Sequence, residues 1–583
     1  METFYTSERN AQMLVYLMKA HGVRKAVVSP GTTNICFVAS MQQDSFFELY
    51  SSVDERSAAY MACGLAAESG EPVALSCTGA TASRNYLPGL TESYYRKLPV
   101  LAVTSTQHTG RIGQNIPQVI DRTNPINDTV KLSVQIPLVH DTEDEWACGV
   151  MLNKALLELK RHGGGPVHIN LETSYSQDFT VKKLPPVPVV DRVCYGEKLP
   201  ELKSGRVGIF VGAHKRWSTE LTQAVDAFCD AYDGVVICDH TSNYHGKYRV
   251  LAPLATTQKL YRASCLSMDV MIHIGDISGA YMDVNPEQVW RVNPDGEVRD
   301  TFRRLRYVFE MEEVDFFRFY AGQTDGKKGS VSFYSEWKME LGKLQSKIPE
   351  LPFSNIWAAK QAAPLLPEGS VLHLGILNSL RAWNFFEIPE SVLVYSNTGG
   401  FGIDGGVSSL AGAALAVPYK LFFGVVGDLA FFYDMNVLGN RHFGKNIRLM
   451  LINNGRGTEF RNYNHPAARF GEDADLYMAA AGHFGRQSPC LVKHYAEDLG
   501  YEYLCASNKK EYLTALKRFV SQEPAEKPML FEVFTDYRDE SDALKAMYTL
   551  ETSIQGAAKQ KAKDILGEHG VMMLKKVKGK LKN

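Results

Sequence analysis

The sequence lacks the features that mark several classes of protein. No two of its ten cysteines form a C-x-x-C pair, and several, such as Cys63, Cys77 and Cys238, fall inside apolar runs. This pattern favours reduced, buried thiols over disulfides or a zinc site. The sequence also has no signal-peptide pattern and no apolar run of about 18 residues. We therefore expect no membrane span and a cytoplasmic protein.

An excess of charge of one sign is also missing. Lysine and arginine number 63 against 65 acidic residues, so the formal net charge is −2 and no nucleic-acid partner is indicated. The exception is the C-terminal tail, 551–583, which contains eight lysines and three acidic residues. An anionic partner or membrane surface would bind such a tail, but a frayed, solubilising terminus is the favoured interpretation.

What the chain does contain is length and a repeated alternation of apolar strands with helices. At 583 residues it is too long for a single core. The βαβ rhythm predicts an α/β fold with parallel, doubly wound sheets. A linker rich in proline, 184–188, marks a boundary. We predict three doubly wound parallel-sheet domains and a basic tail, at 1–185, 200–345, 354–550 and 551–583.

The clearest chemical pattern lies near the end of the third predicted domain. Two apolar strands, 421–426 and 447–452, flank a helix predicted over about 430–442. The first strand leads to Asp428 and the second to Asn454, so these side chains should meet at the carboxyl edge of one parallel sheet. A carboxylate, an amide oxygen and a nearby carbonyl suit Mg²⁺ completed by phosphate oxygens. The residues alone predict a metal-diphosphate site.

Two other glycine-rich stretches compete with this interpretation. The segment 400–405 fits the dinucleotide fingerprint and has Asp428 about 20 residues further on, which leaves a nicotinamide or flavin oxidoreductase as the rival enzyme class. However, a glycine before Asp428 and its pairing with Asn454 suit a metal better than a ribose hydroxyl. The segment 439–446 nearly matches a phosphate-binding loop, but Asn446 replaces the required Ser or Thr, and we reject it.

Several short motifs occur in an order that resembles one subfamily of the thiamine-diphosphate enzymes. They are Asn378-Ser379-Leu380, Tyr395-Ser396-Asn397 leading to Gly402-Ile403-Asp404-Gly405, and Gly427-Asp428-Leu429 with Asp434-Met435-Asn436. The chain is similar to the 2-succinyl-5-enolpyruvyl-6-hydroxy-3-cyclohexene-1-carboxylate synthases, the thiamine-dependent carboligases of menaquinone biosynthesis. The resemblance is clearest over 25–125 and 370–460. It implies that the three domains are pyrimidine-binding, middle and diphosphate-binding.

The resemblance also implies the cofactors and their contacts. Thiamine diphosphate and Mg²⁺ would bind, with Asp428, the Asn454 side chain and the carbonyl of Arg456 as the protein ligands of the metal. Family members usually have glycine at the third position, but a carbonyl ligand tolerates arginine. The other cofactor contacts that the resemblance implies are Thr78, Gly79, Ser379, Leu380, Gly402, Ile403, Gly427 and Leu429. Of these, Ile403 would support the bent cofactor.

Two further residues are candidates for catalysis. Glu55 stands at a predicted helix start, where the helix dipole favours an acid without any function. Its surroundings, DERSAAYMACGLA, resemble the glutamate helix of the family, which implies that its carboxylate bonds N1′ of the aminopyrimidine and helps to form the reactive ylid. Gln118 falls where the subfamily has an active-site glutamine, with a plain loop amide as the alternative.

Substrate binding is where the sequence departs from the subfamily. The subfamily binds polyanionic substrates through arginines, and at four matching positions this chain has Thr33, Gln107, Trp383 and Thr398. The four replacements predict a less acidic substrate. The other substrate candidates are Thr32, His108, Arg381, Glu459, Phe460 and Arg461, with Arg84 and His465 as further replacement cations. Each has the alternative of an ordinary solvated loop residue.

Together these patterns predict a thiamine-diphosphate- and Mg²⁺-dependent enzyme that decarboxylates a 2-oxo acid and passes the acyl anion to a carbonyl acceptor, not the menaquinone-pathway reaction itself. A simple decarboxylase, the oxidoreductase and a scaffold without turnover are the alternatives. In this family one chain's glutamate domain meets another's diphosphate domain, so we expect a homodimer or dimer of dimers with shared active sites.

Overall fold

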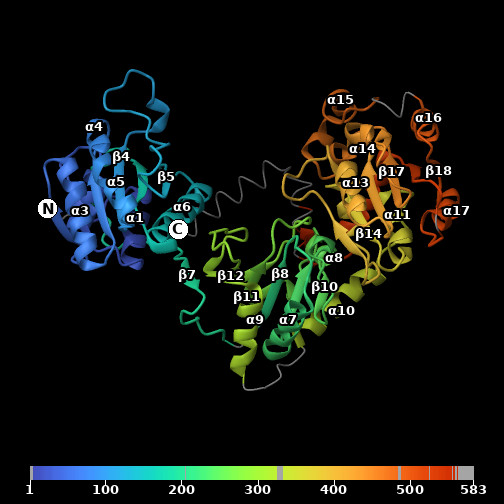
Figure 1. Cartoon of the computed structure of the whole chain (residues 1–583), viewed down its shortest axis with the longest axis horizontal. Coiled ribbons are helices and arrows are strands. Elements are labelled where there is room, and N and C mark those ends of the chain that lie inside the picture. Colours follow the sequence, from blue (N-terminus) through green and yellow to red (C-terminus); the bar gives the residue numbers. More distant parts are fainter. Residues whose placement is uncertain are drawn as a thin grey trace. The chain divides into compact units, whose positions relative to one another are not determined.

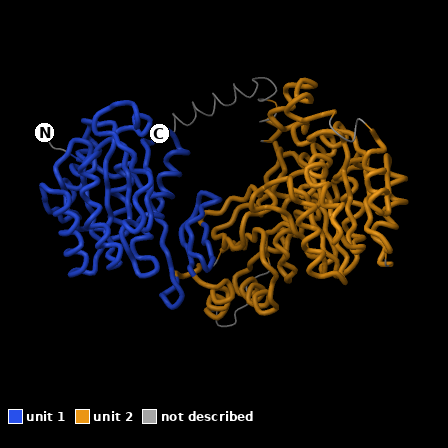
Figure 2. The backbone as a smooth tube through the Cα atoms, turned by 45° about the horizontal axis from the view of Figure 1, so that its top comes forward, with its two compact units in different colours: residues 1–199, 289–310 blue, residues 200–288, 311–583 orange. Residues whose placement is uncertain are grey.

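The computed structural model describes residues 4–203, 205–324, 332–482, 488–523, 525–554, 556–558 and 561. The chain divides into two compact units (Figure 2). Unit 1 comprises residues 1–199 and 289–310, and unit 2 comprises residues 200–288 and 311–583. The domain boundaries predicted near 185, 200 and 345 stay predictions. Most of the basic tail, 551–583, lies outside the described residues.

The first sheet belongs to unit 1 and is parallel throughout, with the strand order β2-β1-β3-β4-β6-β5 (Figure 1). Its strands are β1 (Lys25–Val28), β2 (Glu48–Ser51), β3 (Val73–Cys77), β4 (Val100–Thr106), β5 (Leu132–Ile136) and β6 (Val167–Glu172). Its main helices are α1 (Arg9–Ala20), α2 (Ile35–Gln42), α3 (Glu55–Ser69), α4 (Thr81–Asn85), α5 (Leu87–Tyr95) and α6 (Thr142–Glu158).

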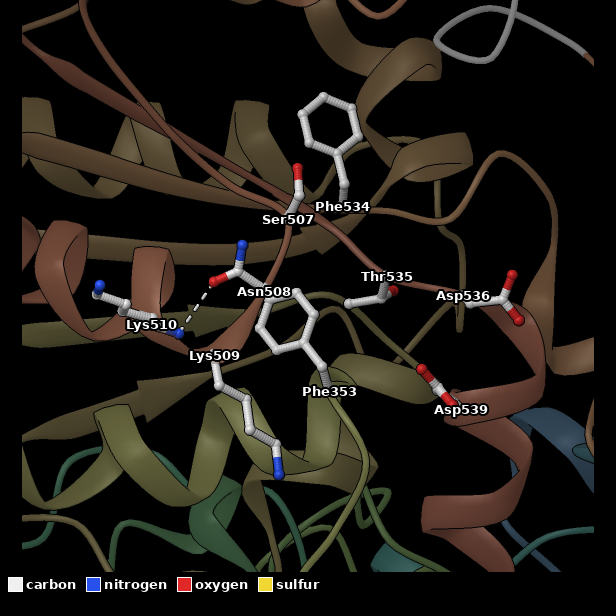
Figure 3. Close-up of a pocket in the computed structure, with 9 residues that line it drawn as sticks. All are labelled: Phe353, Ser507, Asn508, Lys509, Lys510, Phe534, Thr535, Asp536 and Asp539. Atoms are coloured by element: carbon white, nitrogen blue, oxygen red, sulfur yellow. Dashed lines mark hydrogen bonds between the residues drawn. The ribbon is translucent and has the colours of Figure 1, made fainter.

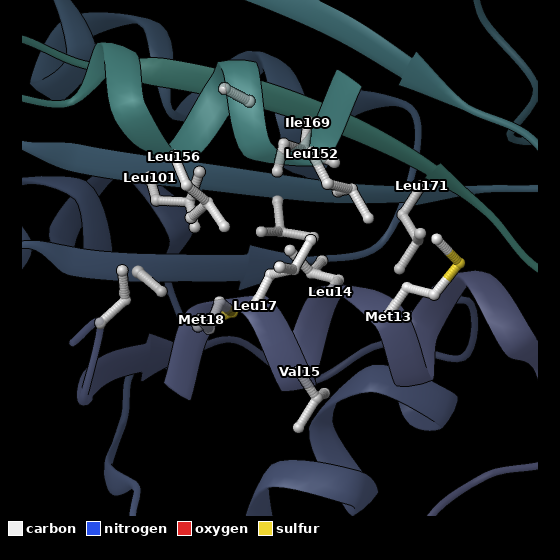
Figure 4. Packing of buried hydrophobic residues seen from close by; sticks show 14 of the residues in the cluster. Met13, Leu14, Val15, Leu17, Met18, Leu101, Leu152, Leu156, Ile169 and Leu171 are labelled. Carbon is white, nitrogen blue, oxygen red and sulfur yellow. The ribbon is translucent and has the colours of Figure 1, made fainter. Parts of the chain in front are cut away.

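Alternation along the strands of this sheet separates two apolar cores. Ala26 and Ala74 face a core with α1, α2 and α6, whereas their neighbours Val27 and Leu75 face a core with α3, α4 and α5. Figure 4 shows the first core, where side chains of α1 meet those of α6 and the strands. Helices cover both faces of the sheet, so the sequence of each strand is a continuous apolar run. Loops follow the carboxyl ends of the strands.

The middle part of the chain contributes strands to each unit, and the division at residue 288/289 falls inside β12. In unit 2 the order is β10-β9-β8-β11, and in unit 1 it is β12-β13-β7. The strands are β7 (Asp191–Cys194), β8 (Val207–Val211), β9 (Val235–Cys238), β10 (Arg249–Leu251), β11 (Ser267–Ile274), β12 (Asn285–Val292) and β13 (Leu305–Glu310). The longer helices are α7 (Thr219–Tyr232), α9 (Glu313–Ala321) and α10 (Ser332–Ser346).

The third sheet lies in unit 2, is parallel, and has the order β15-β14-β16-β17-β19-β18. Its strands are β14 (Val371–Leu374), β15 (Leu393–Tyr395), β16 (Phe422–Gly427), β17 (Ile447–Asn453), β18 (Glu502–Ala506) and β19 (Met529–Phe534). Its helices include α11 (Asn355–Ala362), α12 (Asn378–Trp383), α13 (Gly406–Ala416), α14 (Asp428–Asp434), α16 (Leu491–Asp498), α17 (Lys509–Phe519) and α18 (Tyr537–Tyr548). The predicted α/β class with parallel sheets is confirmed.

Some element boundaries differ from the sequence-based expectation. The helix expected over about 430–442 is α14 followed by a 3₁₀ turn, Met435–Gly439. At the end of α14 the Asp434 carboxylate accepts hydrogen bonds from the backbone N–H and the hydroxyl of Ser408. Helix α7 begins at Thr219, where the Ser218 hydroxyl accepts a hydrogen bond from the N–H of Leu221 and caps the helix. Within the described residues, no helix is long and apolar enough to span a membrane.

Candidate active site

Asp428 stands where β16 passes into α14, at the carboxyl edge of the third sheet. Its Oδ1 accepts a hydrogen bond from the N–H of Leu429 at 2.7 Å. Its Oδ2 accepts three more, from the N–H groups of Asn454 at 3.2 Å, Gly455 at 2.5 Å and Arg456 at 3.1 Å. The loop that follows β17 thus wraps around the carboxylate, because β16 and β17 are parallel neighbours.

The surroundings of Asp428 suit a hard cation. The side chain is 4% exposed, and burial raises its pKa to about 6 although the four N–H groups oppose that shift. The Oδ1 of Asn454 is buried and finds no hydrogen-bond partner among the described residues. An orphaned amide oxygen beside a buried carboxylate offers two of the oxygen ligands that Mg²⁺ uses.

A metal held only by acidic, histidine or cysteine side chains is not supported. The described residues contain no group of three or more His, Cys, Asp or Glu side chains that could hold a metal ion. A cation at Asp428 and Asn454 would therefore need further oxygens from the backbone, water or a ligand's phosphates. The residues present fit Mg²⁺ bound together with a diphosphate.

The Arg456 side chain is fixed away from the carboxylate that its N–H contacts. Its Nη1 pairs with Asp475 at 2.7 Å, and its guanidinium lies 4.1 Å from the ring centroid of Tyr537. Arg461 joins the same cluster, 3.3 Å from Asp475 and 4.8 Å from the Tyr537 ring. These contacts anchor both sides of the loop after Asn454.

A small cavity lies beside this corner, at the carboxyl ends of β14, β15 and β16. Gly402 and Ile403, two of the predicted cofactor contacts, line it, and so does Ser396, whose buried hydroxyl has no hydrogen-bond partner in the described part of the chain. Gly427 joins the same edge of the sheet to α14. The predicted cofactor residues of the third sheet therefore gather around one edge.

Helix α12 carries the two residues predicted to meet the diphosphate. Ser379 and Leu380 are both buried, and the Ser379 hydroxyl lies 3.4 Å from the amide nitrogen of Asn355. Leu377, the residue before the helix, has φ 69° and ψ −115°, a conformation that costs free energy in any residue with a side chain. Phe401, before the Gly402 turn, also has positive φ, at 55°.

In unit 1, Glu55 is the first residue of α3 and is half-buried. The preceding Asp54 caps this helix, since its carboxylate accepts hydrogen bonds from the N–H groups of Arg56 and Ser57. Helix α3 lies close to its neighbour α5: a Cβ on Gly89 would come 2.4 Å from that of Ala59. The helix start that carries Glu55 is thus fixed by a cap and by tight packing.

Four other predicted residues of unit 1 meet around one strained turn. The Thr78 hydroxyl is 2.6 Å from that of Thr33. A Cβ on Gly79 would lie only 2.8 Å from the carbonyl oxygen of Gln118, so glycine is required there. Gln118 and Ala80 both have positive φ, at 66° and 54°. Strained residues of this kind cluster at ligand sites.

The predicted substrate residues differ in burial and in the contacts that they make. Thr33, Trp383 and Thr398 are buried, Gln107 accepts a hydrogen bond from Arg111, and the His108 ring accepts one from the N–H of Gly110. Thr32 is exposed, and Phe460 stacks edge-on against His465 with 5.2 Å between ring centroids.

Two of the cations predicted to replace the missing arginines, Arg381 and Arg461, are already engaged. Arg381 forms two hydrogen bonds with Glu459, at 2.8 and 3.0 Å, and Asn462 donates to the same carboxylate at 3.1 Å. Arg461 is held by Asp475. The pairing satisfies these charges within the chain, so they are poor receptors for a substrate carboxylate.

Two larger hollows open in unit 2. One, of about 480 Å³, lies beside α12 and is lined by Arg381, Phe401 and Tyr548 among others. The other, of about 580 Å³, lies where β18 and β19 lead into α17 and α18, with Phe353 and Lys509 on its wall (Figure 3). None of the predicted site residues lines this second hollow.

Comparisons with known proteins decide the family. Residues 9–124 match the model described as "Thiamine pyrophosphate enzyme, N-terminal TPP binding domain". A 2-succinyl-5-enolpyruvyl-6-hydroxy-3-cyclohexene-1-carboxylate synthase of Bacteroides fragilis is 31% identical over 567 residues, covering 93% of this chain and 99% of the relative. The synthase of the same name from Phocaeicola vulgatus is 31% identical over 577 residues, covering 93% and 98%. The chain belongs to the thiamine-diphosphate-dependent enzymes.

A solved structure also aligns with this thiamine-diphosphate enzyme. It is the Rhodococcus jostii RHA1 thiamine diphosphate-dependent 4-hydroxybenzoylformate decarboxylase, at 16% identity and a TM-score of 0.38, covering 90% of this chain and 99% of that chain. A similarity this low supports no inference about the chain. The family assignment from sequence decides between the thiamine enzyme and the nicotinamide or flavin oxidoreductase in favour of the first.

Sequence reasoning missed the residues that hold this enzyme's predicted site in shape. Asp475 and Tyr537 anchor Arg456, and Arg122 lies behind the Gly79 turn, with its Nη1 3.4 Å from where a Cβ of that glycine would be. No spacing rule points to such residues, because each is distant in sequence from the group it contacts. The positive φ values at Ala80 and Leu377 are visible only in the structure.

Proposed function

We propose that the chain is a Mg²⁺- and thiamine-diphosphate-dependent enzyme that decarboxylates a 2-oxo acid and transfers the resulting acyl anion to a carbonyl acceptor. The observation that carries the proposal is the corner of Asp428 and Asn454: a buried carboxylate beside an orphaned amide oxygen, at the carboxyl edge of the third sheet. Family membership supplies the cofactor class, and the edge of the sheet is where such a ligand binds in α/β folds.

The proposed roles follow from what each side chain can do. Asp428 and the Asn454 oxygen would hold Mg²⁺ with the Arg456 carbonyl, and Ser379 and the start of α12 would meet the diphosphate. When bound, thiamine diphosphate supplies the nucleophilic carbon and the electron sink that lets CO₂ leave. Glu55 would hold a proton at N1′ of the pyrimidine.

The remaining contacts would position and enclose the cofactor. Gly79, which tolerates no Cβ, lets a planar ring approach the backbone of its turn. Ile403 would press on the cofactor from the cavity between β14 and β16, and Gln118 would orient the substrate. Because the described parts of the two units carry different halves of this machinery, neither unit has a complete set of the proposed residues.

We infer a two-fold dimer in which Glu55 of one subunit and Asp428 of the other serve one cofactor. Exposed apolar side chains in each unit support a contact surface. In unit 1, Tyr60 and Met61 on α3 are 49% and 41% exposed, close in sequence to Glu55. In unit 2, Tyr433 on α14 is 66% exposed, close in sequence to Asp428. A contact between subunits at these positions would bury these side chains.

The proposed substrates differ from the polyanions that arginines recognise. The subfamily's arginine positions are Thr33, Gln107, Trp383 and Thr398 here, and Arg381 is paired with Glu459. Each charge-assisted contact that is missing forgoes about 1.5–3 kcal/mol of binding. A small donor with one carboxylate, such as pyruvate, and a polar carbonyl acceptor fit a site with fewer cations for binding carboxylates.

A substrate panel tests the proposal. CO₂ release from a set of 2-oxo acids is measured with and without added carbonyl acceptors, in thiamine diphosphate and Mg²⁺. We expect turnover of a monocarboxylate donor that depends on an acceptor. Release of aldehyde without any acceptor would identify a simple decarboxylase. Efficient use of 2-oxoglutarate with isochorismate, at a kcat/KM of about 10⁴ M⁻¹s⁻¹ or more, would contradict the proposed substrate class.

A further inference from the structure

Arg122 is a buried arginine with unused hydrogen-bonding capacity. It is 4% exposed, and its Nη2 donates to the Ser105 carbonyl at 3.2 Å and to Asn170 Oδ1 at 2.8 Å. Its Nε and Nη1 are also buried, yet they have no acceptor in the part of the chain that the structure describes. None of the ion pairs among the described residues includes Arg122. A buried cation without a counter-charge is costly.

Arg122 is one of the residues that line a cavity of about 30 Å³ in unit 1. Arg84, Thr104 and His168 also line it. At about 10–15 Å³ for each water, this space holds two waters or one small polar group. Arg84 is an exposed residue that also lines this cavity, and its Nη2 donates a hydrogen bond to the Asp121 carbonyl at 2.9 Å.

The cavity is positively charged at neutral pH. Burial lowers the pKa of Arg122 to about 10, with the charge of Cys77 opposing this shift and that of Arg84 adding to it, so Arg122 remains protonated at neutral pH. His168 does not add charge: burial lowers its pKa to about 3, and its two ring nitrogens contact the hydroxyls of Thr104 at 2.7 Å and Ser133 at 2.9 Å. No acidic side chain lines the cavity within the described residues.

This cavity lies directly behind a turn predicted to meet the cofactor. Arg122 Nη1 is 3.4 Å from where a Cβ of Gly79 would stand, and the carbonyl of Gln118 is closer still, at 2.8 Å. Ser105, whose carbonyl Arg122 bonds, also accepts a hydrogen bond from the Thr33 hydroxyl at 3.1 Å. The guanidinium is therefore built into the same cluster as three predicted site residues.

We propose that Arg122 and Arg84 form a binding site for a single carboxylate group. A carboxylate supplies the acceptors that the two free nitrogens lack, neutralises a buried charge, and matches the planar donors of a guanidinium better than water does. The cavity is large enough for a formate-sized group and for little more. The carboxylate belongs either to the 2-oxo acid substrate or to a free small carboxylate resident in the fold.

The test is thermal unfolding of the full-length protein with sodium formate as the probe. Formate replaces sodium gluconate, which is too large for the cavity, at constant ionic strength. We expect the midpoint of unfolding to rise by about 2 °C or more as formate increases. Arg122→Gln, which keeps a donor but loses the charge, removes this response. Arg96→Gln, at an exposed arginine of the same unit that pairs with Glu92, retains it.

An equal formate response in Arg122→Gln and the parent, or none in the parent, overturns the proposal and leaves water as the occupant. If Arg122→Gln does not fold, Arg122→Lys keeps a positive charge without the planar fork, and its formate response must be weaker than that of the parent. The unfolding experiment does not measure enzyme activity, so its outcome does not depend on the proposed function.

A second arm, which rests on the proposed function, distinguishes the two sources of the carboxylate. If the group belongs to the substrate, formate competes with pyruvate, and Arg122→Gln raises the KM for pyruvate about tenfold with little change in kcat. If the carboxylate is resident, the KM is unchanged while the formate response in unfolding is still lost. An enzyme that turns over no 2-oxo acid would contradict the proposed function but not the anion site.

Discussion

At the scale of single residues, two carboxylates carry the proposed chemistry, and their surroundings differ. Asp428 is almost fully buried and receives four backbone N–H groups, a setting that holds a charge in place for a cation. Glu55 is half-buried at a helix start, where it remains accessible to a ligand. The first setting suits binding and the second suits proton handling.

Glu55→Gln tests the proton role. The amide has the same shape but cannot stabilise a protonated pyrimidine, so thiamine diphosphate should still bind while exchange of its C2 proton slows by about 10²–10⁴-fold, or roughly 3–5 kcal/mol. Exchange is followed by NMR. Glu68→Gln, on the exposed face of the same helix, is the control and should exchange normally. An unchanged rate in Glu55→Gln would rule out the role.

Glu540 makes stability depend on pH. Burial raises its pKa from 4.5 to about 7, and the charges of Asp539 and Asp428 raise it further, while hydrogen bonds from Thr535 and Asn355 oppose the shift. The folded state therefore keeps a proton that the unfolded state releases between pH 4.5 and 7, and this contribution of about 3 kcal/mol is lost as pH rises through that window.

Glu540→Gln removes the titration but keeps the hydrogen bonds that the side-chain oxygen accepts. The unfolding temperatures of the parent and the variant should be closer at pH 5 than at pH 8, where the variant should be the more stable. Scans at both values of pH check this. A constant difference between the two proteins would show that Glu540 titrates normally.

At the scale of elements, the start of α12 stores backbone strain next to the proposed diphosphate contacts. Leu377→Gly and Leu377→Ala both remove the side chain, but only alanine keeps the Cβ that φ 69° disfavours. We expect the glycine variant to be the more stable by about 1 kcal/mol, although glycine is the more flexible residue. Calorimetric unfolding of the pair checks this, and a more stable alanine variant would contradict the strain.

Much of the arrangement of helices and strands around the site follows from the sequence. Parallel β16 and β17 must bring Asp428 and Asn454 to one edge, and the structure places them 3.2 Å apart at the bonded atoms. The contact between Asp434 and Ser408 could not be predicted, because the two residues lie 26 positions apart. Periodicity predicts which face of a helix is buried, not which polar contacts its side chains make.

Polar pairing in loops was the least predictable part of the candidate site. Arg381 and Glu459 are 78 positions apart, and each alone resembles a solvated loop residue, so both were predicted to contact substrate. The structure pairs them with each other. Arg122 gave no signal in the sequence, since its burial depends on how strands β4 and β6 and the Gly79 turn come together.

At the scale of the whole molecule, the predicted residues are divided between the two units. Mixing inactive Glu55→Gln with inactive Asp428→Ala tests whether sites are shared between subunits. In a dimer with shared sites, random subunit exchange makes half of the dimers mixed, and each mixed dimer has one site that carries neither change, so about a quarter of the parent activity should return. Exchange is verified by mass-tagged subunits. Verified exchange without recovery would contradict shared sites.

The most direct test of the account is calorimetric titration of thiamine diphosphate into the full-length protein with and without Mg²⁺. The parent should bind tightly only with Mg²⁺, and Asp428→Ala, which removes the one full charge among the proposed ligands, should lose binding at least a hundredfold while its circular dichroism stays unchanged. Asp434→Asn, a buried acid six positions further along α14, should still bind. Binding by Asp428→Ala that equals the parent's would contradict the metal-diphosphate site.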